Sequence, residues 1–481
     1  MKSLHPIFLI IGLLLSTLGA SMMLPAIVDL VADNEDWEVF AFTGTLTLLV
    51  GVGLYFGARG TTSVLSTRQA FVMTTAAWLV MTVFGALPYL LSGMVPTFTD
   101  AFFESMSGLT TTGSTVIEGL DFAPPGILLW RGIQQWLGGL GIIVMAIAVL
   151  PMLQVGGMQL FKIEAFDTAE KIMPRATQIS GSVTLVFIFI TLLCAIAYLI
   201  AGMEVADAFI HAMTTVATGG FSTKDGSIGH FESNAIEMVA CTFMILGSIP
   251  FILYVQALQG RPDKLWSNSQ VQVFLTVLAG FIAIAWAMHP GVEGNEYGRL
   301  VQSAFNVTSI MTGTGYASTD YGLWAPGANA LFFVMMFIGG CAGSTSCGIK
   351  IFRFQVLFEV IRQQLYRIYS PNGIFVMRFN NARIEPHVAG AVMNFFAVYF
   401  LLFGLAAILL NMTGLDFLTS MSAAGTAISN VGPGLGEIIG PSGNFKELND
   451  TAKWILSATM LVGRLELFTV LVLFMPRFWR G

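Results

Sequence analysis

The sequence predicts an all-α protein that crosses a membrane about ten times, and three observations carry this prediction. Hydrophobic residues make up 55% of the 481 residues and charged residues only 10%, with a mean hydropathy of +0.76. A soluble chain of this length could not bury so much apolar surface. Apolar runs of about 20 residues, the length that a bilayer demands, recur along the chain. Basic residues gather in alternate segments between those runs.

The apolar runs define ten expected spans. The first is too long for the apolar region of a signal peptide and should be retained as a span. One other run is too long for a single helix and should be broken near its middle. The runs lie near residues 6–28, 39–58, 70–92, 126–150, 181–202, 234–257, 270–288, 327–366, 388–411 and 452–475.

The basic residues indicate the orientation. If the N-terminus lies in the cytoplasm, most of the 22 lysines and arginines fall on the cytoplasmic side, as the positive-inside rule requires. An even number of spans then places both termini there. Two basic clusters mark this face: Arg362, Arg367, Arg378 and Arg383 in one, and Lys162, Lys171 and Arg175 in the other.

Several function classes lack support in the sequence. The four cysteines and five histidines show no metal-ligand spacing. No nucleophile motif or phosphate-binding loop is present, and no soluble stretch is long enough for a catalytic domain. We therefore expect neither an enzyme nor an organic cofactor, and no nucleic-acid partner.

Four half-span segments form an internal repeat. They read DAFFESMSGLTTTGST, DAFIHAMTTVATGGFST, SAFNVTSIMTGTGYAST and DFLTSMSAAGTAISNVGPG. Each starts with Asp or Ser, a helix N-cap type, and continues as a half helix into a Thr/Ser/Gly/Asn-rich loop. They recur about every 100 residues. They begin at Asp100, Asp207, Ser303 and Asp416 and align on Gly113, Gly220, Gly315 and Gly432.

The expected organisation is four repeats of span, re-entrant loop and span. Two spans per repeat make successive repeats parallel, so they surround an axis along the membrane normal. The expected divisions are 1–69 for two extra N-terminal spans, 70–150 for repeat 1, 181–260 for repeat 2, 270–370 for repeat 3 with an intramembrane loop at 338–350, and 388–477 for repeat 4.

Re-entrant loops of this kind suit a cation. Non-helical backbone at membrane depth is tolerated only where protein buries it or water reaches it, so the loops should line a central pore. Each short helix directs the negative end of its dipole toward the axis. Loop carbonyls can then replace part of the hydration shell of an ion. For any single loop, a turn or a tight helix contact is the commoner explanation, but four in register favour a pore.

Five residues after each aligned glycine stands an acidic residue. Acidic residues are only 28 of 481, which favours a real ring around an outer vestibule over the general polarity of outer loops. The members of this ring are Glu118, Asp225, Asp320 and Glu437.

The stretches TTTGST, ATGGFST, TGTGYAST, SNVGPG and IGGCAGSTSCGIK resemble the superfamily of Trk, Ktr and HKT cation transporters, most closely its Trk-type potassium-uptake membrane subunits. The resemblance covers essentially the whole chain. It implies a potassium filter in which the four glycines follow residues that supply carbonyls to the ion. No loop carries a full TVGYG motif, so the filter should be less exacting than that of tetrameric potassium channels. The implied filter residues are Thr111, Thr112, Gly113, Thr218, Gly219, Gly220, Gly313, Thr314, Gly315, Asn430, Val431 and Gly432.

Two features are gate candidates below the filter. The break at 338–350 is rich in glycine and carries a polar Ser-Thr-Ser run, which favours an irregular pore-facing segment over a tight helix crossing. The resemblance implies that it obstructs the pathway. Arg464 lies within the last span, where a charge is costly and usually functional. The alternative is an ion pair with Glu466, although two positions apart on a helix they would face nearly opposite ways. The resemblance implies a pore arginine. The gate residues are Arg464, Gly343, Ser344, Thr345, Ser346 and Gly348.

The predicted function is potassium uptake across a bacterial cytoplasmic membrane through a gated, channel-like pore, with potassium as the transported substrate. Coupling to Na⁺ or H⁺ is left open. One alternative is a sodium-coupled or sodium-permeable Ktr/HKT-like transporter. Another is an alternating-access solute carrier, which would need inverted repeats that are not visible. The resemblance also implies a homodimer and a cytoplasmic, nucleotide-binding regulatory subunit (TrkA-like).

Overall fold

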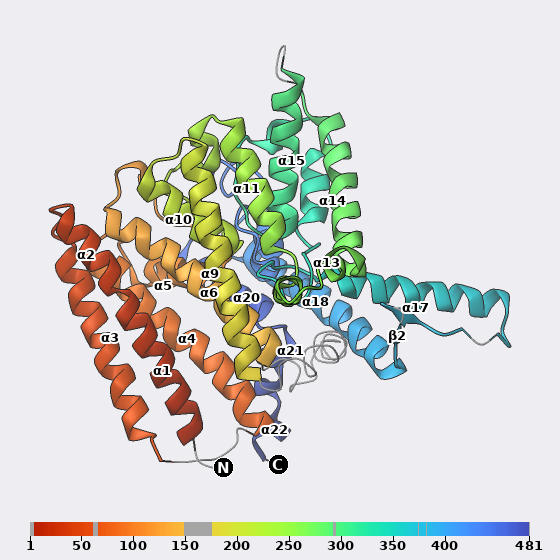
Figure 1. The fold of residues 1–481 in the computed structure, drawn as a ribbon, viewed down its shortest axis with the longest axis horizontal. Coiled ribbons are helices and arrows are strands. Elements are labelled where there is room, and N and C mark those ends of the chain that lie inside the picture. Colours follow the sequence, from red (N-terminus) through yellow and green to blue (C-terminus); the bar gives the residue numbers. More distant parts are fainter. Residues whose placement is uncertain are drawn as a thin grey trace.

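The computed structural model describes residues 4–60, 66–148, 176–291, 295–373, 375–380 and 382–480, and nearly all of these are helical (Figure 1). The predicted basic cluster of Lys162, Lys171 and Arg175 lies outside the described residues. The all-α prediction is confirmed. The two short strands, β1 (Arg378–Phe379) and β2 (Ala382–Arg383), form one antiparallel hairpin.

Helices of membrane-spanning length dominate the described residues. Seven are long and apolar enough to cross a membrane, and two bent pairs raise the count to nine. The one remaining expected run, 327–366, is broken as predicted, with α16 (Ala328–Met335) before the break and α17 (Ile351–Tyr369) after it. The long helices are α1–α2 (His5–Ser21 and Met23–Val31), α3 (Trp37–Gly57), α4 (Thr67–Leu91), α6 (Pro125–Ala148), α9 (Ala176–Ile200), α14 (Ser269–Met288) and α18 (Pro386–Met412).

The order of long helix, short helix and second helical segment occurs four times after α3. The short helices are fully or largely buried between their longer neighbours, although they are too short to span a bilayer. They are α5 (Phe98–Leu109), α10 (Val205–Val216), α15 (Glu296–Thr312) and α19 (Phe417–Ser429).

The expected N-caps of the short helices are right at only one position. Asp416 caps α19 by accepting a hydrogen bond from the Thr419 backbone N–H at 3.1 Å. Asp100 and Asp207 lie within the first turns of their helices, and Ser303 lies further along α15. Asp100 instead forms an ion pair with Lys453 at 2.6 Å, a long-range contact that the local sequence pattern does not contain.

Close glycine contacts hold α1 against α3. A Cβ on Gly12 would lie 2.7 Å from the Gly51 carbonyl oxygen, and one on Gly19 would lie 2.8 Å from that of Gly44. Small residues at a helix crossing let the backbones approach within lipid, where no hydrophobic effect drives association. This N-terminal unit also contacts α6, because the Asp29 carboxylate accepts a hydrogen bond from the Gly126 N–H at 2.7 Å.

Two of the expected spans bend sharply. α11 (Asn234–Gly247) and α12 (Phe251–Leu258) meet at 87°, and α20 (Asp450–Arg464) meets the helical segment Phe468–Phe474 at 108°. The second break has positive φ angles at Glu466 and Leu467. The remaining short elements are η1 (Leu120–Phe122), η2 (Ser227–Phe231), α13 (Asp263–Ser267), η3 (Tyr321–Leu323), α21 (Phe468–Leu471), η4 (Val472–Phe474) and α22 (Pro476–Arg480).

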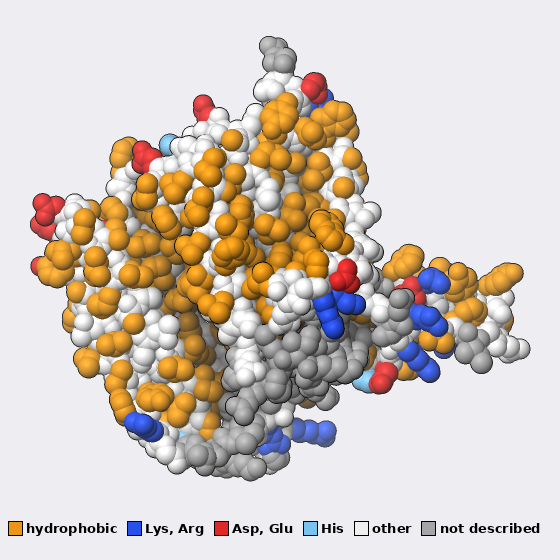
Figure 2. Space-filling view, viewed as in Figure 1, with side chains coloured by type: hydrophobic (Ala, Val, Ile, Leu, Met, Phe, Trp, Pro, Cys, Tyr) orange, Lys and Arg blue, Asp and Glu red, His pale blue; other side chains and the backbone are white. Residues whose placement is uncertain are grey.

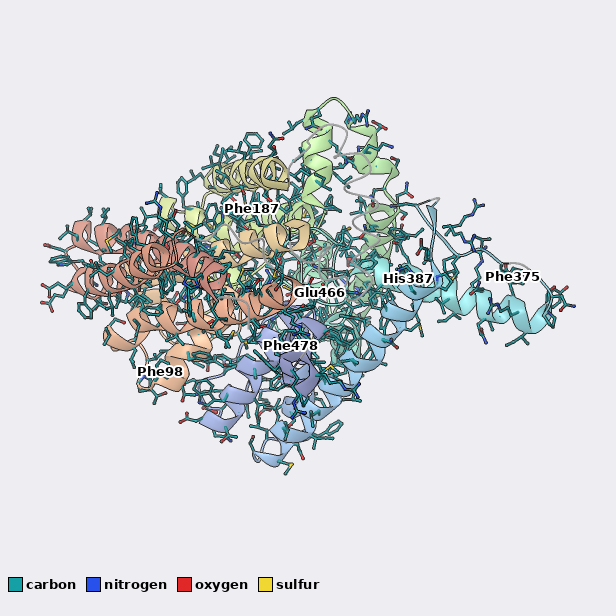
Figure 3. All side chains as sticks on the ribbon, turned by 90° about the horizontal axis from the view of Figure 1, so that it is seen from below. Phe98, Phe187, Phe375, His387, Glu466 and Phe478 are labelled. Atoms are coloured by element: carbon teal, nitrogen blue, oxygen red, sulfur yellow. The ribbon has the colours of Figure 1, made fainter. Side chains whose placement is uncertain are left out.

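Charged side chains gather toward the two ends of the molecule. Figure 2 shows a broad hydrophobic belt, with mainly acidic side chains along the upper rim and most of the visible basic side chains, together with a few acidic ones, at the lower edge and on the arm at the right. α17 and the hairpin form an arm that extends sideways from the bundle (Figure 1). Seen from below, Glu466 lies near the middle of the molecule, whereas Phe375 lies far out on this arm (Figure 3).

Candidate functional site: a ring of four loops and the segment beneath it

The four loops that follow the short helices share one unusual backbone pattern. The aligned glycine of each loop has a positive φ, between 79° at Gly220 and 105° at Gly432. The residue two positions earlier is also left-handed in every loop, as Thr111, Thr218, Gly313 or Asn430. Left-handed φ is uncommon in residues other than glycine and costs free energy. Its recurrence at equivalent positions shows that the loops have one shape despite different residues.

The same hydrogen bond closes every loop. The N–H of the residue before the glycine donates to the carbonyl six residues before that glycine, as a helix-ending motif does. The pairs are Thr112 N to Ser107 O at 2.9 Å, Gly219 N to Thr214 O at 2.8 Å, Thr314 N to Ser309 O at 2.9 Å, and Val431 N to Thr426 O at 3.1 Å.

The loops meet in a closed ring. A Cβ on Gly113 would overlap the carbonyl oxygen of Gly219 in the next loop. A Cβ on Gly220 would overlap that of Thr314, and one on Gly315 that of Val431. The ring closes where a Cβ on Gly432 would lie 3.0 Å from the carbonyl oxygen of Thr112. The chain order 1-2-3-4 is therefore also the order around the ring, and glycine is required at each junction.

Buried side chains tie the loops to the surrounding helices. Gln135 of α6 donates to the Gly219 carbonyl at 2.6 Å and accepts from the Phe221 N–H at 2.9 Å. Asn430 donates to the Thr112 hydroxyl at 2.9 Å, which links loop 4 to loop 1. The Tyr316 hydroxyl lies 2.5 Å from that of Thr214. These bonds satisfy polar atoms that would be costly to bury alone.

A buried ion pair supports the first two loops. Arg131 of α6 contacts Glu104 of α5 at 2.9 Å and donates to the Ser222 carbonyl at 2.6 Å. Its guanidinium also lies 4.1 Å from the centroid of the Phe221 ring. This pair was not predicted from the sequence, although a charge within an apolar run is a usable signal.

A hollow of about 70 Å³ lies above the ring and is lined by the four glycines. Asp225 lines it, together with Lys224 and Arg131. The other three members of the predicted acidic ring do not. Glu118 pairs with Lys446 at 2.5 Å, and Asp320 accepts from the Gly322 N–H at 2.8 Å as the cap of η3.

The hydrogen bonds from Lys446 and then Asn444 lower the pKa of the Glu118 carboxyl below its ordinary value. Glu118 therefore keeps its charge to a lower pH than an ordinary glutamate, and that charge is matched by Lys446. The remaining member, Glu437, lies outside the lining of the hollow.

The segment 338–350 lies directly beneath the ring. Thr345 donates to the Val216 carbonyl at 3.0 Å, and Ser346 donates to that of Thr312 at 2.7 Å. The Gly348 N–H donates to the Ser429 carbonyl at 2.9 Å. One segment thus contacts the last turns of α10, α15 and α19, with positive φ at Gly343 and Gly348.

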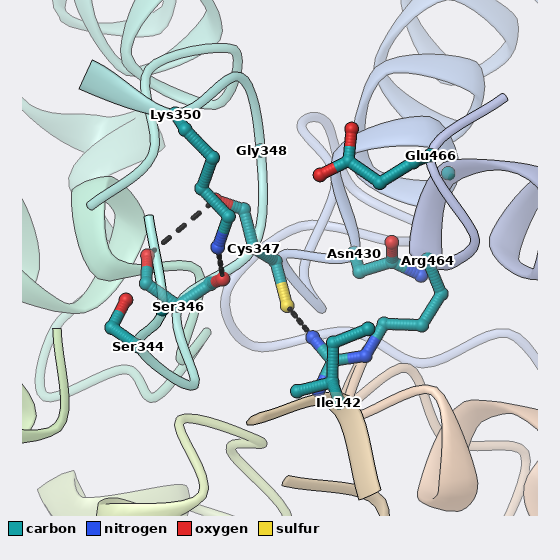
Figure 4. A pocket seen from close by; sticks show the side chains of 11 residues that line it. Ile142, Ser344, Ser346, Cys347, Gly348, Lys350, Asn430, Arg464 and Glu466 are labelled. Carbon is teal, nitrogen blue, oxygen red and sulfur yellow. Dashed lines mark hydrogen bonds between the residues drawn. The ribbon is translucent and has the colours of Figure 1, made fainter. Parts of the chain in front are cut away.

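Arg464 is buried at the end of α20 and contacts this segment (Figure 4). One guanidinium nitrogen lies 2.7 Å from the Cys347 sulfur and 3.3 Å from the Thr345 carbonyl. A second lies 3.5 Å from the Gly138 carbonyl. The Cys347 sulfur is also 3.5 Å from the Thr111 hydroxyl, so it joins Arg464 to the underside of loop 1.

The suspected partner of Arg464 pairs elsewhere. Glu466 forms an ion pair with Arg353 of α17, which also stacks 3.7 Å from the Phe395 ring centroid. The two residues are separated as predicted, but for a different reason. α20 ends at Arg464, so the chain turns away before Glu466 instead of continuing as a helix.

The space between ring and segment is small. Asn430, Arg464, Lys350 and Ser346 are among the residues that line a cavity of about 30 Å³ (Figure 4). At about 10–15 Å³ for each water molecule, this cavity has room for only about two waters. The Lys350 ammonium donates to the Ser346 carbonyl across this space.

Comparisons with known proteins agree along the whole chain. A family model described as "TrkH: Cation transport protein" matches residues 37–289 and 264–480. The potassium uptake protein TrkI of Halomonas elongata is 42% identical over 99% of this chain and 97% of its own length. TrkH of Escherichia coli K12 is 36% identical over 98% of each. The crystal structure of the potassium transporter TrkH from Vibrio parahaemolyticus superimposes with a TM-score of 0.92 at 35% identity, covering both chains completely.

Proposed function

The chain belongs to the TrkH family of cation transport proteins, and on that premise we propose that it takes up potassium across a bacterial cytoplasmic membrane through a gated, channel-like pore. Its relatives are named as transport proteins and not as enzymes, in agreement with the absence of catalytic motifs. The transported substrate is the potassium ion itself.

The ring of loops is the observation that carries this proposal. The four carbonyls that face the ring glycines belong to Thr112, Gly219, Thr314 and Val431. Carbonyl oxygens carry partial negative charge and replace water around a dehydrated cation. The C-terminal ends of α5, α10, α15 and α19 precede the loops, and their dipoles also favour a positive ion. The remaining predicted filter residues complete the same loops.

The segment beneath the ring is the proposed gate. In the arrangement described, it contacts the last turns of three short helices and, through Cys347, loop 1, and it leaves a cavity of only about 30 Å³. Gly343, Ser344, Thr345, Ser346 and Gly348 form the part that must move. Its hold on the ring consists of a few single hydrogen bonds, each with a net value of about 0.5–1.5 kcal/mol.

Arg464 is the proposed electrostatic barrier. Two like charges about 4 Å apart repel by about 4 kcal/mol at an effective dielectric constant near 20. Half of this value would slow permeation more than about tenfold. An ion leaving the ring therefore passes faster when the segment and the arginine move away together. The contact between Arg464 and Cys347 couples these two movements.

Regulation and assembly complete the proposal. Both termini and the basic edge would face the cytoplasm, as the positive-inside rule predicts. A cytoplasmic, nucleotide-binding TrkA-like subunit would move the segment, and the membrane subunit would act as a homodimer. The family resemblance supports these two points, and the basic arm of α17 and the hairpin is a surface on which an acidic soluble partner could dock.

Reversal potentials test the proposed function. The purified protein is placed in planar bilayers under separate K⁺, Na⁺ and pH gradients. We expect the potential to follow the K⁺ gradient. A potential that follows Na⁺ would favour the sodium-permeable alternative. A current that vanishes without a coupled ion gradient would favour a carrier and overturn the channel-like pore.

A further inference from the structure

A groove of about 460 Å³ lies where the arm joins the bundle, outside the ring and the gate. Its long side is apolar and is formed by Val273 of α14 and by Phe354 and Phe358 of α17. Its end is polar and is formed by Arg378 and Asn380 of the hairpin. The groove therefore offers an apolar trough that ends at a fixed positive charge.

Arg378 lines the polar end, Arg383 stands beside it in the hairpin, and neither has a counter-charge among the described residues. Arg378 is directly opposite Arg383 in the hairpin, so both side chains extend from one face of the ribbon. Both are exposed, and neither forms an ion pair with an acidic residue in the part of the chain that the structure describes. Glu359, which lines the same groove, is already paired with Arg362 at 3.0 Å. Like charges directly opposite destabilise a hairpin, unless an anion lies between them.

The hairpin is held in place for this role. Asn380 accepts a hydrogen bond from the Ser269 N–H at 3.1 Å, which pins the turn to the first residue of α14. The N-terminus of a helix of 20 residues adds partial positive charge at the same end of the groove. The Ser269 hydroxyl is buried there with no hydrogen-bond partner among the described residues.

The groove also lies at the right depth. α17 exposes Phe358, Ile361 and Leu365 and carries Arg362 and Arg367 on the same arm. Figure 2 shows hydrophobic and basic side chains together along this arm, at the lower edge of the hydrophobic belt. Arg362 lies one turn from Phe358, among these apolar side chains, and Arg367 lies on the opposite side of the helix. An apolar helix surface flanked by basic residues lies in the membrane interface and is attracted to anionic lipids.

We propose that this groove binds an anionic phospholipid, with an acyl chain along Val273, Phe354 and Phe358 and the phosphate between Arg378 and Arg383. The inference rests on the proposed membrane orientation, which places the groove in the cytoplasmic leaflet. It requires neither potassium conduction nor a particular gate. A lipid at this position would brace α14 against α17, the helix that directly follows the gate segment on the chain.

Native mass spectrometry tests the site. The full chain is reconstituted in nanodiscs made from an equimolar mixture of phosphatidylglycerol and phosphatidylcholine, and the lipids retained on the protein are counted. We expect one retained phosphatidylglycerol for each copy of the chain. At about 1 kcal/mol for each arginine, the double variant Arg378→Gln/Arg383→Gln should lose its preference for this lipid by about thirtyfold.

Two further variants separate a built site from general attraction. Arg367→Gln/Arg477→Gln removes the same charge from exposed positions away from the groove and should retain the lipid. Val273→Trp fills the trough, leaves both arginines in place, and should displace the lipid. A single gel-filtration peak and an unchanged helical circular-dichroism spectrum report correct folding of each variant. Because nanodiscs are symmetric and this control does not involve potassium, failure of the orientation or of the transport proposal would not alter the count.

Three results would overturn the site. Equal retention of both lipids would indicate ordinary annular lipid. Equal loss in both double variants would indicate bulk electrostatics. Wild-type dimers without bound phosphatidylglycerol that become monomers in the Arg378→Gln/Arg383→Gln variant would show that a second copy of the chain occupies the groove.

Discussion

The ring and the segment beneath it face the same axis but are held differently. In the ring, four closing hydrogen bonds of 2.8–3.1 Å and four glycine junctions fix the backbone itself. The segment is held to the ring by single contacts, from the Thr345, Ser346 and Cys347 side chains and from the Gly348 N–H. The proposed filter therefore cannot change shape without losing the carbonyls that would bind the ion. The proposed gate can be released from the ring by breaking a few single contacts, so selection and gating would be separable.

The largest expected effect comes from breaking the ring. Gly220→Ser places a Cβ against the Thr314 carbonyl and strains a backbone with a φ of 79°. Overpacking costs about 1–3 kcal/mol, which corresponds to a roughly five- to 150-fold fall in K⁺ flux if it acts on permeation. Uptake into cells lacking other potassium transporters measures it.

Gly53→Ser is the matched control for Gly220→Ser, since a Cβ at Gly53 meets nothing within 4 Å. Full flux and unchanged K⁺ selectivity in Gly220→Ser would mean that the ring does not contact the ion.

The next effect has the opposite sign and sharpens the contrast. Arg464→Ala, or deletion within Gly343–Gly348, should raise flux about tenfold and reduce dependence on the cytoplasmic partner, because a barrier of a few kcal/mol is removed. Flux is measured per correctly folded molecule in proteoliposomes. If well-folded variants conduct no faster than the wild type, the arginine is a structural element and not a barrier.

A smaller gain in K⁺ flux should follow when only the contact between Arg464 and Cys347 is removed. Cys347→Ala removes the sulfur that lies 2.7 Å from Arg464 but keeps the arginine. Loss of one hydrogen bond of about 1 kcal/mol predicts a rise of about fivefold in flux. Cys347→Ser, which retains a hydrogen-bond acceptor, is the control and should stay near the wild-type value. Equal flux in the two variants would show that the contact between Arg464 and Cys347 does not hold the segment in place.

The smallest effect concerns the outer vestibule. Neutralising Glu118, Asp225, Asp320 and Glu437 together should lower uptake by about twofold to tenfold at low ionic strength, because salt screens such fields within about 10 Å at 0.1 M. Asp225→Asn alone should account for most of this loss, since only Asp225 lines the hollow. Glu118→Gln should matter least, because Lys446 already matches its charge. An unchanged rate at low salt would exclude the acidic field.

Local constraints explain how much of this molecule the sequence could predict. The apolar runs, the break at 327–366 and the glycine column each depend on properties of single residues or short windows, such as hydropathy and tolerance of positive φ. These were enough for an all-α membrane protein with loops aligned on Gly113, Gly220, Gly315 and Gly432. The bends after Gly247 and Arg464 were not predicted, although Pro250 in the first run and the charges of Arg464 and Glu466 in the second are signals that could have indicated them.

Only the tertiary structure decided which residues meet. The sequence by itself placed Arg464 within a span and Cys347 in a glycine-rich segment. These two residues are 117 positions apart, and no local pattern indicates that they are in contact. The same holds for Arg131 with Glu104 and for Arg353 with Glu466. A buried charge needs a partner, and a charged residue within an apolar run indicates that need in the sequence. The choice of partner is made by which helices pack side by side, a property of the whole fold.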